Sequence, residues 1–196
     1  MSALPQQTPV VMTEAEYLAF ERASELKHEF IQGEVFAMTG ASEAHNLISV
    51  NLITTLKTQL RGRPCKIYPG DMRLKVEASG LYTYPDISVV CGEAQFVDEE
   101  FDTLTNPTLL IEVLSPSTEG YDRGKKFQEY RKLASLREYL LVSQDSARIE
   151  RFLLQETDLW ELTDAIGLDA VIELPSIDCT LALAEVYEQV TFAENP

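Results

Sequence analysis

Hydrophobic residues follow two spacings along the chain, and these spacings divide it into helical and extended segments. A capping pattern at Thr13 opens a helix that is expected to end at about Lys27. Helical spacing returns over residues 43–60, and the expected apolar stripe contains Leu47, Val50, Ile53 or Thr54, and Leu56 or Lys57. A hairpin is predicted at 28–38, turning at Gln32–Gly33. Strand-like runs are predicted at 65–68, 72–76, 84–91, 109–114 and 138–143.

A further helix is expected between the last two strands, ending at about Ala134. The tail alternates in strand fashion at 148–154, 159–163 and 171–174 and closes with a helix at 181–189. Helices and strands mix without strict alternation, which predicts an α+β, mixed-sheet fold. The 196 residues are expected to form one domain, with a core at about 42–145, an N-terminal extension at 12–41 and a C-terminal meander and helix at 146–192.

Two carboxylates interrupt apolar strands. Glu112 lies inside the run 109–114, and Asp86 follows Pro85 in the strand 84–91. A buried carboxylate needs a partner, and if the two strands pair, these two acids lie side by side. A divalent cation such as Mg²⁺ would remove their repulsion. The alternative is that each acid pairs with an arginine or lies at an exposed strand end.

The helix after Glu112 carries Asp122, Lys126 and Tyr130 at spacings that place them on one inward face. Asp122 is the expected N-cap of this helix. An inward lysine requires an anion, either Glu112 or a bound phosphate. The alternative is a simple helical ion pair between Asp122 and Lys126. Two carboxylates and an amine together describe metal-assisted hydrolysis of a phosphodiester.

Charge and cysteine usage restrict the class of protein. The net charge is −16, although residues 57–75 and 121–137 carry net charges of +5 and +4. These windows predict either a local positive face or ordinary solvated surfaces. The three cysteines are widely spaced, so we expect no disulfide framework, no zinc cluster and a cytoplasmic location. The chain carries no membrane-length apolar run, P-loop, HExxH, GxSxG or CxxC motif.

Three weaker candidates accompany the main constellation. His45, near the start of the helix 43–60, is positioned to approach the site, but a lone histidine is more often structural. Asp71 is a candidate third acid from the neighbouring strand, and Glu34 is a similar candidate in the hairpin. Each of these residues also fits an ordinary surface role.

The order of elements, with Pro85-Asp86 and Glu112-Val113-Leu114, resembles the PD-(D/E)XK nuclease superfamily. More closely, residues 13–190 resemble the Uma-type restriction-endonuclease family. Three segments carry this likeness, namely HEFIQGEVFAM, YPDISVV and IEVLSPSTEGYDRGKKFQEYRKLASLREYLLVSQD. The resemblance implies a restriction-endonuclease-like fold and a Mg²⁺ or Mn²⁺ ion held by Asp86, Glu112 and the backbone carbonyl of Val113. The superfamily's usual lysine is here Leu114, and the following helix implies that Lys126 replaces it.

The leading hypothesis is therefore a Mg²⁺- or Mn²⁺-dependent DNA endonuclease. A second hypothesis is an inactive nuclease fold that serves as a nucleic-acid-binding or dimerisation module, which Leu114 and the net charge favour. A third is a metal-dependent hydrolase of a small phosphate ester. The resemblance also implies a homodimer, because nucleases that cut both strands often pair.

Overall fold

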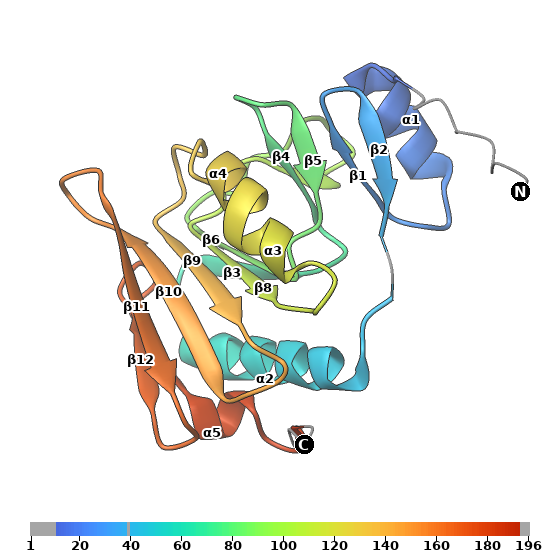
Figure 1. Cartoon of the computed structure of the whole chain (residues 1–196). Helices are drawn as coiled ribbons and strands as arrows, with labels where there is room; N and C mark the ends of the chain where they lie inside the picture. Colours follow the sequence, from blue (N-terminus) through green and yellow to red (C-terminus); the bar gives the residue numbers. More distant parts are fainter. Residues whose placement is uncertain (1–10, 39, 193–196) are drawn as a thin grey trace, which may run out of the picture.

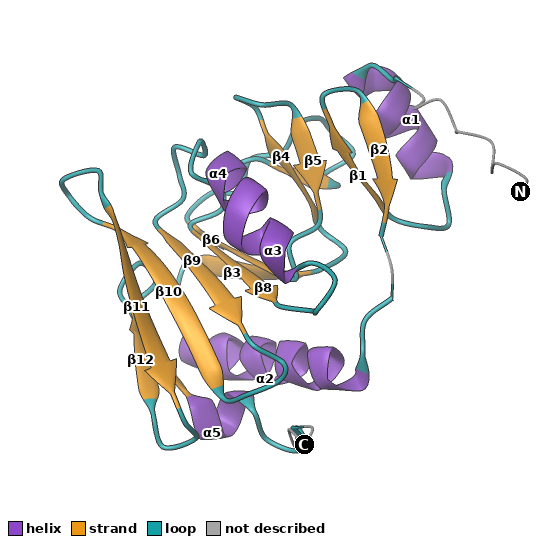
Figure 2. Cartoon of the chain, in the orientation of Figure 1, coloured by secondary structure: helices purple, strands orange, loops and turns teal. Residues whose placement is uncertain are grey.

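The computed structural model describes residues 11–38 and 40–192, and two β-sheets with flanking helices form its framework (Figures 1 and 2). The helices are α1 (Glu14–Ala23), α2 (Glu43–Gln59), α3 (Glu119–Tyr121), α4 (Phe127–Tyr130) and α5 (Leu183–Val186), and a π-helical turn (Asp122–Lys126) joins α3 to α4. The strands of the first half are β1 (His28–Ile31), β2 (Glu34–Ala37), β3 (Cys65–Pro69), β4 (Arg73–Val76), β5 (Leu81–Thr83) and β6 (Ile87–Cys91). Those of the second half are β7 (Thr103–Leu104), β8 (Leu109–Val113), β9 (Glu138–Val142), β10 (Arg148–Leu154), β11 (Trp160–Ile166), β12 (Val171–Leu174) and β13 (Cys179–Ala182).

A six-stranded mixed sheet forms the centre of the fold, in the order β11-β10-β9-β8-β6-β3. Strands β8 and β9 are parallel, and the other neighbours are antiparallel. One face packs on α2, where Ile48 and Leu52 contact a core that includes Ile111. The other face packs on α4, where Phe127 and Tyr130 share a second core with neighbouring strands. Alternating side chains of β8 thus enter two different cores, which confirms the mixed α+β prediction.

A second sheet has the order β2-β1-β5-β4-β7 and carries α1 against one face. Tyr17 of α1 stacks on Phe30 of β1 with ring centroids 4.8 Å apart, and Tyr82 of β5 completes this small core. The predicted hairpin at 28–38 is correct, since Gln32 and Gly33 form its turn with positive φ. Strands β5 and β7 were not predicted, because runs of three and two residues are too short for a periodicity.

Several predicted boundaries are wrong for local reasons. Helix α1 ends at Ala23, because Ser24 is extended. The helix expected up to Ala134 ends at Tyr130. The tail contains β13 at Cys179–Ala182, so the last helix covers only Leu183–Val186. Cys179 and Leu181 are buried while Thr180 is exposed, a strand alternation that the overlapping helical pattern concealed.

The predicted apolar stripe of α2 is correct for Leu56 and wrong for Val50. Ile48, Leu52 and Leu56 are fully buried, whereas Val50 is 60% exposed. Apolar residues occur on more than one face of this helix, so spacing alone could not choose the face that meets the sheet. Val50 and Ile53 instead line a surface cleft.

The expectation that the cysteines stay unpaired is wrong for Cys65 and Cys91. They lie directly opposite each other in the antiparallel pair β3–β6 and form a disulfide bond. Their separation of 26 residues concealed this proximity in the sequence, because only strand pairing brings them together. Cys179 is free and buried.

The two basic windows do not form a continuous positive face. Arg73 and Lys75 are buried and pair with Asp102 and with Glu14 and Glu77, respectively. Arg123, in the second window, pairs with Glu119 and Glu150. Together with Arg63, Lys126 and Lys132, half of the twelve basic residues of these windows are paired with acids within the fold. Over the described parts of the chain, the helices are too short or too polar to cross a lipid bilayer.

Candidate functional site

The pairing of β6 with β8 brings Asp86 and Glu112 to one place. Ile87 of β6 lies opposite Ile111 of β8, and one step further along this antiparallel register Asp86 lies opposite Glu112. Asp86 comes just before β6 and not inside it, which corrects the prediction that it interrupts the strand. Both side chains line a cleft of about 940 Å³. The walls of this cleft come from the β1–β2 hairpin, the first half of α2 and the turn between β8 and α3.

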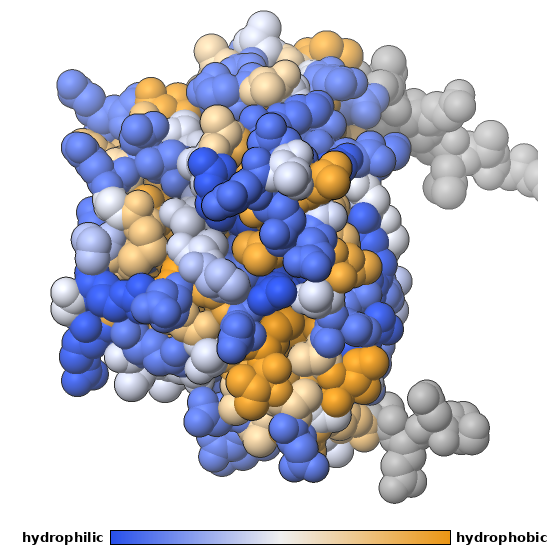
Figure 3. All heavy atoms as spheres, turned by 90° about the vertical axis from the view of Figure 1, so that its left-hand side faces the viewer, coloured by the Kyte–Doolittle hydropathy of each residue, from blue (hydrophilic) through white to orange (hydrophobic). Residues whose placement is uncertain are grey.

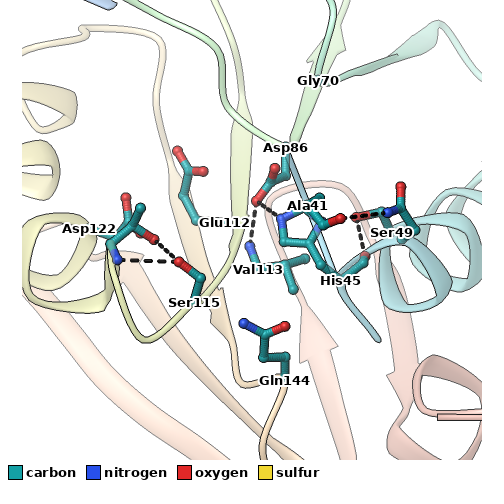
Figure 4. A network of polar contacts seen from close by, with 12 residues as sticks. Ala41, His45, Ser49, Gly70, Asp86, Glu112, Val113, Ser115, Asp122 and Gln144 are labelled. Atoms are coloured by element: carbon teal, nitrogen blue, oxygen red, sulfur yellow. Dashed lines mark hydrogen bonds and ion pairs between the residues drawn. The ribbon is translucent and has the colours of Figure 1, made fainter. Parts of the chain in front are cut away.

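Asp86 is held by one backbone and one side-chain group (Figure 4). Its Oδ2 accepts a hydrogen bond from the N–H of Val113 at 2.7 Å and lies 3.1 Å from Nε2 of His45. His45 is fixed in the first turn of α2, whose N-cap Ser42 accepts from the His45 N–H. His45 therefore does approach the site. Val113 contributes an N–H to Asp86, and a role for its carbonyl stays a prediction.

Glu112 points from β8 toward the face of the sheet that packs on α4. Its carboxylate accepts a hydrogen bond from the Tyr130 hydroxyl at 2.7 Å and lies 2.9 Å from Nζ of Lys126. The residue is only 3% exposed. Lys126 and Tyr130 come from the segment after β8, on the inward face that their spacing predicted. The apolar neighbours of Glu112 along β8 account for its burial.

Lys126 lies at the centre of a cluster of carboxylates. Its Nζ is 2.9 Å from Glu112, 3.3 Å from Glu29 and 3.4 Å from Asp122. The π-helical turn places Asp122 and Lys126 together at the buried side of the segment. Such turns occur frequently at functional sites, because the wider turn re-aims side chains. One ammonium thus faces three carboxylates.

Glu29 is a site residue that the sequence reasoning missed. It lies on β1, accepts a hydrogen bond from the Thr83 hydroxyl and faces Lys126. The available signal was alternation: Phe30 enters the core beneath α1, so Glu29 must point to the other face of its sheet. That alternation gives the direction of Glu29 but not its neighbour, which belongs to a segment about a hundred residues later.

Three weaker expectations are corrected or narrowed. Asp122 does not cap a helix, because α3 begins at Glu119 and the carboxylate of Asp122 faces Lys126. Asp71 lies in the turn after β3, where it pairs with Lys27 at 2.5 Å with an 84% exposed side chain at the rim of the cleft. Glu34 is exposed at the hairpin turn and lies outside the lining of the cleft. Neither Asp71 nor Glu34 therefore serves as a third acid beside Glu112.

Burial changes the protonation of this cluster. It raises the pKa of Glu112 to about 8, since Lys126 only partly offsets the loss of hydration and Asp122 and Asp86 add repulsion. Burial also raises the pKa of Asp122. For Lys126, burial acts to lower the pKa, but the surrounding carboxylates raise it well above the usual value. Near neutral pH the lysine is therefore charged, and Glu112 retains much of its proton.

Glu112 should make the metal-free protein less stable as the pH rises. Its pKa is about 8 in the fold against 4.5 in the unfolded chain, so the folded state binds more protons between these values. Its stabilising contribution is complete below pH 4.5 and is lost as the pH rises through about 8. Urea unfolding with a chelator should therefore show that the Glu112→Gln variant loses less stability than the unmodified protein from about pH 5 to about pH 9. A pH-independent difference between the two proteins would contradict this assignment.

The donor set fits a hard divalent cation. Glu112 and Asp86 offer carboxylate oxygens beside each other, and a cation would offset the repulsion that raises the pKa of Glu112. Among residues 11–38 and 40–192, no group of three or more His, Cys, Asp or Glu side chains is arranged to hold a metal. Mg²⁺ is commonly held by only one or two carboxylates and keeps several waters, so two acids are a compatible donor set.

Comparisons with known proteins identify the family and the fold. The family model Uma2, described as "Putative restriction endonuclease", matches residues 14–184. Two uncharacterized proteins of Synechocystis sp. are similar: sll1609 is 40% identical over 85% of this chain and 94% of its own length, and slr1290 is 37% identical over 90% and 92%. A crystal structure from Anabaena variabilis, titled a "putative nuclease belonging to DUF820", superposes with a TM-score of 0.74 at 19% identity. It covers 92% of this chain and 99% of that one, and so shares the fold. The chain belongs to the Uma2 family of restriction-endonuclease-like proteins.

Proposed function

We propose that this protein is a Mg²⁺- or Mn²⁺-dependent DNA endonuclease. The observation that carries the proposal is the convergence of Asp86, Glu112 and Lys126 in one cleft. The family description and the fold of the Anabaena protein support a nuclease. A bound divalent ion would polarise a phosphoryl oxygen and acidify a water molecule. Asp86 and Glu112 would hold that ion.

The other side chains would position these groups. Tyr130 fixes one oxygen of Glu112, and His45 together with the Val113 N–H fixes one oxygen of Asp86. Lys126 would offset negative charge on the phosphate in the transition state. If a cation bound Glu112, the ammonium of Lys126 would be free to turn toward the substrate. Because the protein already holds these groups in place, little free energy is needed to reorient them during the reaction.

The departure at Leu114 is compatible with this assignment. Leu114 is 4% exposed and packs in the core beneath α4, so a lysine there would need to leave that core. Lys126 reaches Glu112 from the following segment instead. An amine is therefore present beside the carboxylate, although it comes from a different element from the one in the usual superfamily pattern.

Nicking of supercoiled plasmid tests the proposal. We expect conversion to the nicked form with Mg²⁺ or Mn²⁺ and none in the presence of a chelator. Hydrolysis of one phosphodiester bond by water leaves a phosphate monoester on one side of the nick and a hydroxyl on the other, and end-labelling can detect these ends. Absence of nicking with either ion, in a protein that is folded by circular dichroism, would overturn the proposal.

A second function, an inactive nuclease fold that serves as a dimerisation module, is favoured by the acidic charge of the cleft, which opposes DNA binding. Six acidic and only two basic residues line it, and both lysines are already paired. Calorimetric titration with Mn²⁺ separates the two functions. Mn²⁺ binding that is lost in the Glu112→Gln variant supports the nuclease, and the absence of any Mn²⁺ binding that depends on Glu112 supports the module.

We also propose a homodimer, formed through the face drawn in Figure 3. Apolar side chains gather on part of this face. The edge strand β11 and the segment up to β12 expose Leu162, Ile166, Leu168 and Val171, which are 49–67% accessible. Contiguous exposed apolar residues beside a free sheet edge are typical of an interaction surface.

The Ile166→Asp variant should therefore be monomeric. A charge at this position would be desolvated in the dimer but hydrated in the monomer. Light scattering coupled to size-exclusion chromatography should give twice the mass of the 22.0 kDa chain for the unmodified protein and the mass of one chain for the variant. Leu26→Asp, on a different surface, is the control and should remain dimeric. A monomeric unmodified protein at about 100 μM would refute the dimer.

A further inference from the structure

The side of the cleft away from the carboxylates is apolar and exposed. Phe36 is 49% exposed, Leu26 65% and Val50 60%, and all three line the cleft. Met38 and Ile53 line it as well. We call these five residues the apolar wall. Single exposed apolar residues are ordinary, but several that face one cleft beside a polar site indicate a ligand with an apolar part.

The apolar wall adjoins the acidic cluster directly. Phe36 pairs with Glu29 across β1 and β2, and paired residues of neighbouring strands lie on the same face of a sheet. Glu29 lies 3.3 Å from Lys126, which lies 2.9 Å from Glu112. The aromatic ring therefore lies beside a residue that contacts the proposed catalytic amine.

Part of the apolar wall belongs to α2, the helix that carries His45. Asn46, Val50 and Ile53 recur at helical spacing and all line the cleft. A molecule in the cleft can thus contact an apolar surface on two sides and carboxylates at one end. This division matches a nucleotide, whose base has flat aromatic faces that stack on apolar side chains and whose phosphate would bind at a metal between the carboxylates.

Charge and size favour an unpaired nucleotide over a duplex. Duplex binding relies on basic side chains that contact phosphates, yet the two lysines of the cleft are paired with acids. The volume of about 940 Å³ falls in the range of sites that enclose one small ligand. Stacking on aromatic side chains, in contrast, binds single strands with little dependence on sequence.

We propose that the cleft binds an unpaired nucleotide of single-stranded DNA, with its base against Phe36 and its phosphate directed toward Asp86 and Glu112. This inference rests on the proposed function for the position of the phosphate. It assigns Phe36 as the residue that selects single-stranded over double-stranded substrate. Removal of the ring should weaken binding without altering the carboxylate cluster.

Fluorescence anisotropy with a labelled single-stranded oligonucleotide, and with the same strand in a duplex, tests this. Ca²⁺ replaces Mg²⁺, and a denaturing gel verifies that the DNA stays intact. We expect the single strand to bind at least about 10-fold more tightly than the duplex, and Phe36→Ala to weaken single-strand binding by about 5- to 100-fold. Phe36→Trp should retain binding, because it keeps an aromatic face.

Phe101→Ala is the matched control. Phe101 is 63% exposed but lies in the loop before β7, outside the lining of the cleft, and its replacement should leave binding unchanged. Equal or tighter duplex binding, or an unchanged dissociation constant in Phe36→Ala, would overturn the inference. This test and the nicking test can fail independently. Selective single-strand binding that depends on Phe36 would support the inference even if the protein cuts no DNA. If the protein cuts DNA but binding does not depend on Phe36, only the role of Phe36 is refuted.

Discussion

Plasmid nicking is expected to fall at least about 100-fold when Glu112 is replaced by Gln or Asp86 by Asn. Each change removes a negative ligand for the proposed metal while keeping the size of the side chain. Metal catalysis contributes several kcal/mol to transition-state stabilisation, and each 1.36 kcal/mol corresponds to a factor of ten in rate. Initial rates of conversion from supercoiled to nicked plasmid, at saturating Mg²⁺ and at saturating Mn²⁺, provide the measurement.

The structure supplies a matched control for this experiment. Glu34 lies in the β1–β2 hairpin, and its side chain is exposed to solvent outside the cleft. The Glu34→Gln variant should therefore cut at the rate of the unmodified protein. Calorimetry should also show weaker Mn²⁺ binding in the two cleft variants and unchanged binding in Glu34→Gln. Undiminished nicking in both Glu112→Gln and Asp86→Asn would show that these acids do not hold the reactive metal.

Replacement of Lys126 by Met should reduce both stability and nicking. Lys126 is 5% exposed and is the ammonium that faces Glu112, Glu29 and Asp122. Removal of one partner from a buried ionic cluster costs about 3–5 kcal/mol, because the remaining charges lose their compensation. Protonation of the carboxylates softens this loss, so the destabilisation should be smaller at pH 6 and larger at pH 9. Chemical unfolding at both pH values measures it.

The neighbouring Lys125 is the control for this substitution. It is exposed, so Lys125→Met should change the free energy of unfolding by no more than about 0.5 kcal/mol. The nicking assay adds a second readout. If Lys126→Met were as stable as the unmodified protein and equally active, the central position of this ammonium would have no energetic or catalytic meaning.

Much of the fold could be predicted because its elements have strong local signals. The capping box at Thr13, the hairpin turn at Gln32–Gly33 and the apolar run around Glu112 each depend on neighbouring residues only. The missed strands β5 and β7 have two or three residues each, and they form because long-range partners supply their hydrogen bonds. The sequence also could not identify the face of α2 that meets the sheet, since more than one face of this helix is apolar.

The residues of the site also divide into those that the sequence could identify and those that only the structure could place. The sequence identified Glu112, Asp86 and Lys126 by their chemistry, because a carboxylate in an apolar strand and an inward lysine are unusual wherever they occur. It also assigned a role to Asp71 and Glu34, which the structure places at the rim of the cleft and in solvent. Residue type alone cannot distinguish a carboxylate in the cleft from one outside it.

The sequence by itself determined the elements with strong local signals and the residues that are costly to bury, since both follow from spacing and polarity along the chain. Only the tertiary structure decided which of those residues meet. The register of β6 against β8 set Asp86 opposite Glu112, and the β1–β2 hairpin brought Glu29 to Lys126. Strand pairing likewise joined Cys65 to Cys91. These contacts join segments from 26 to about a hundred residues apart, and such distances in sequence leave no periodic trace.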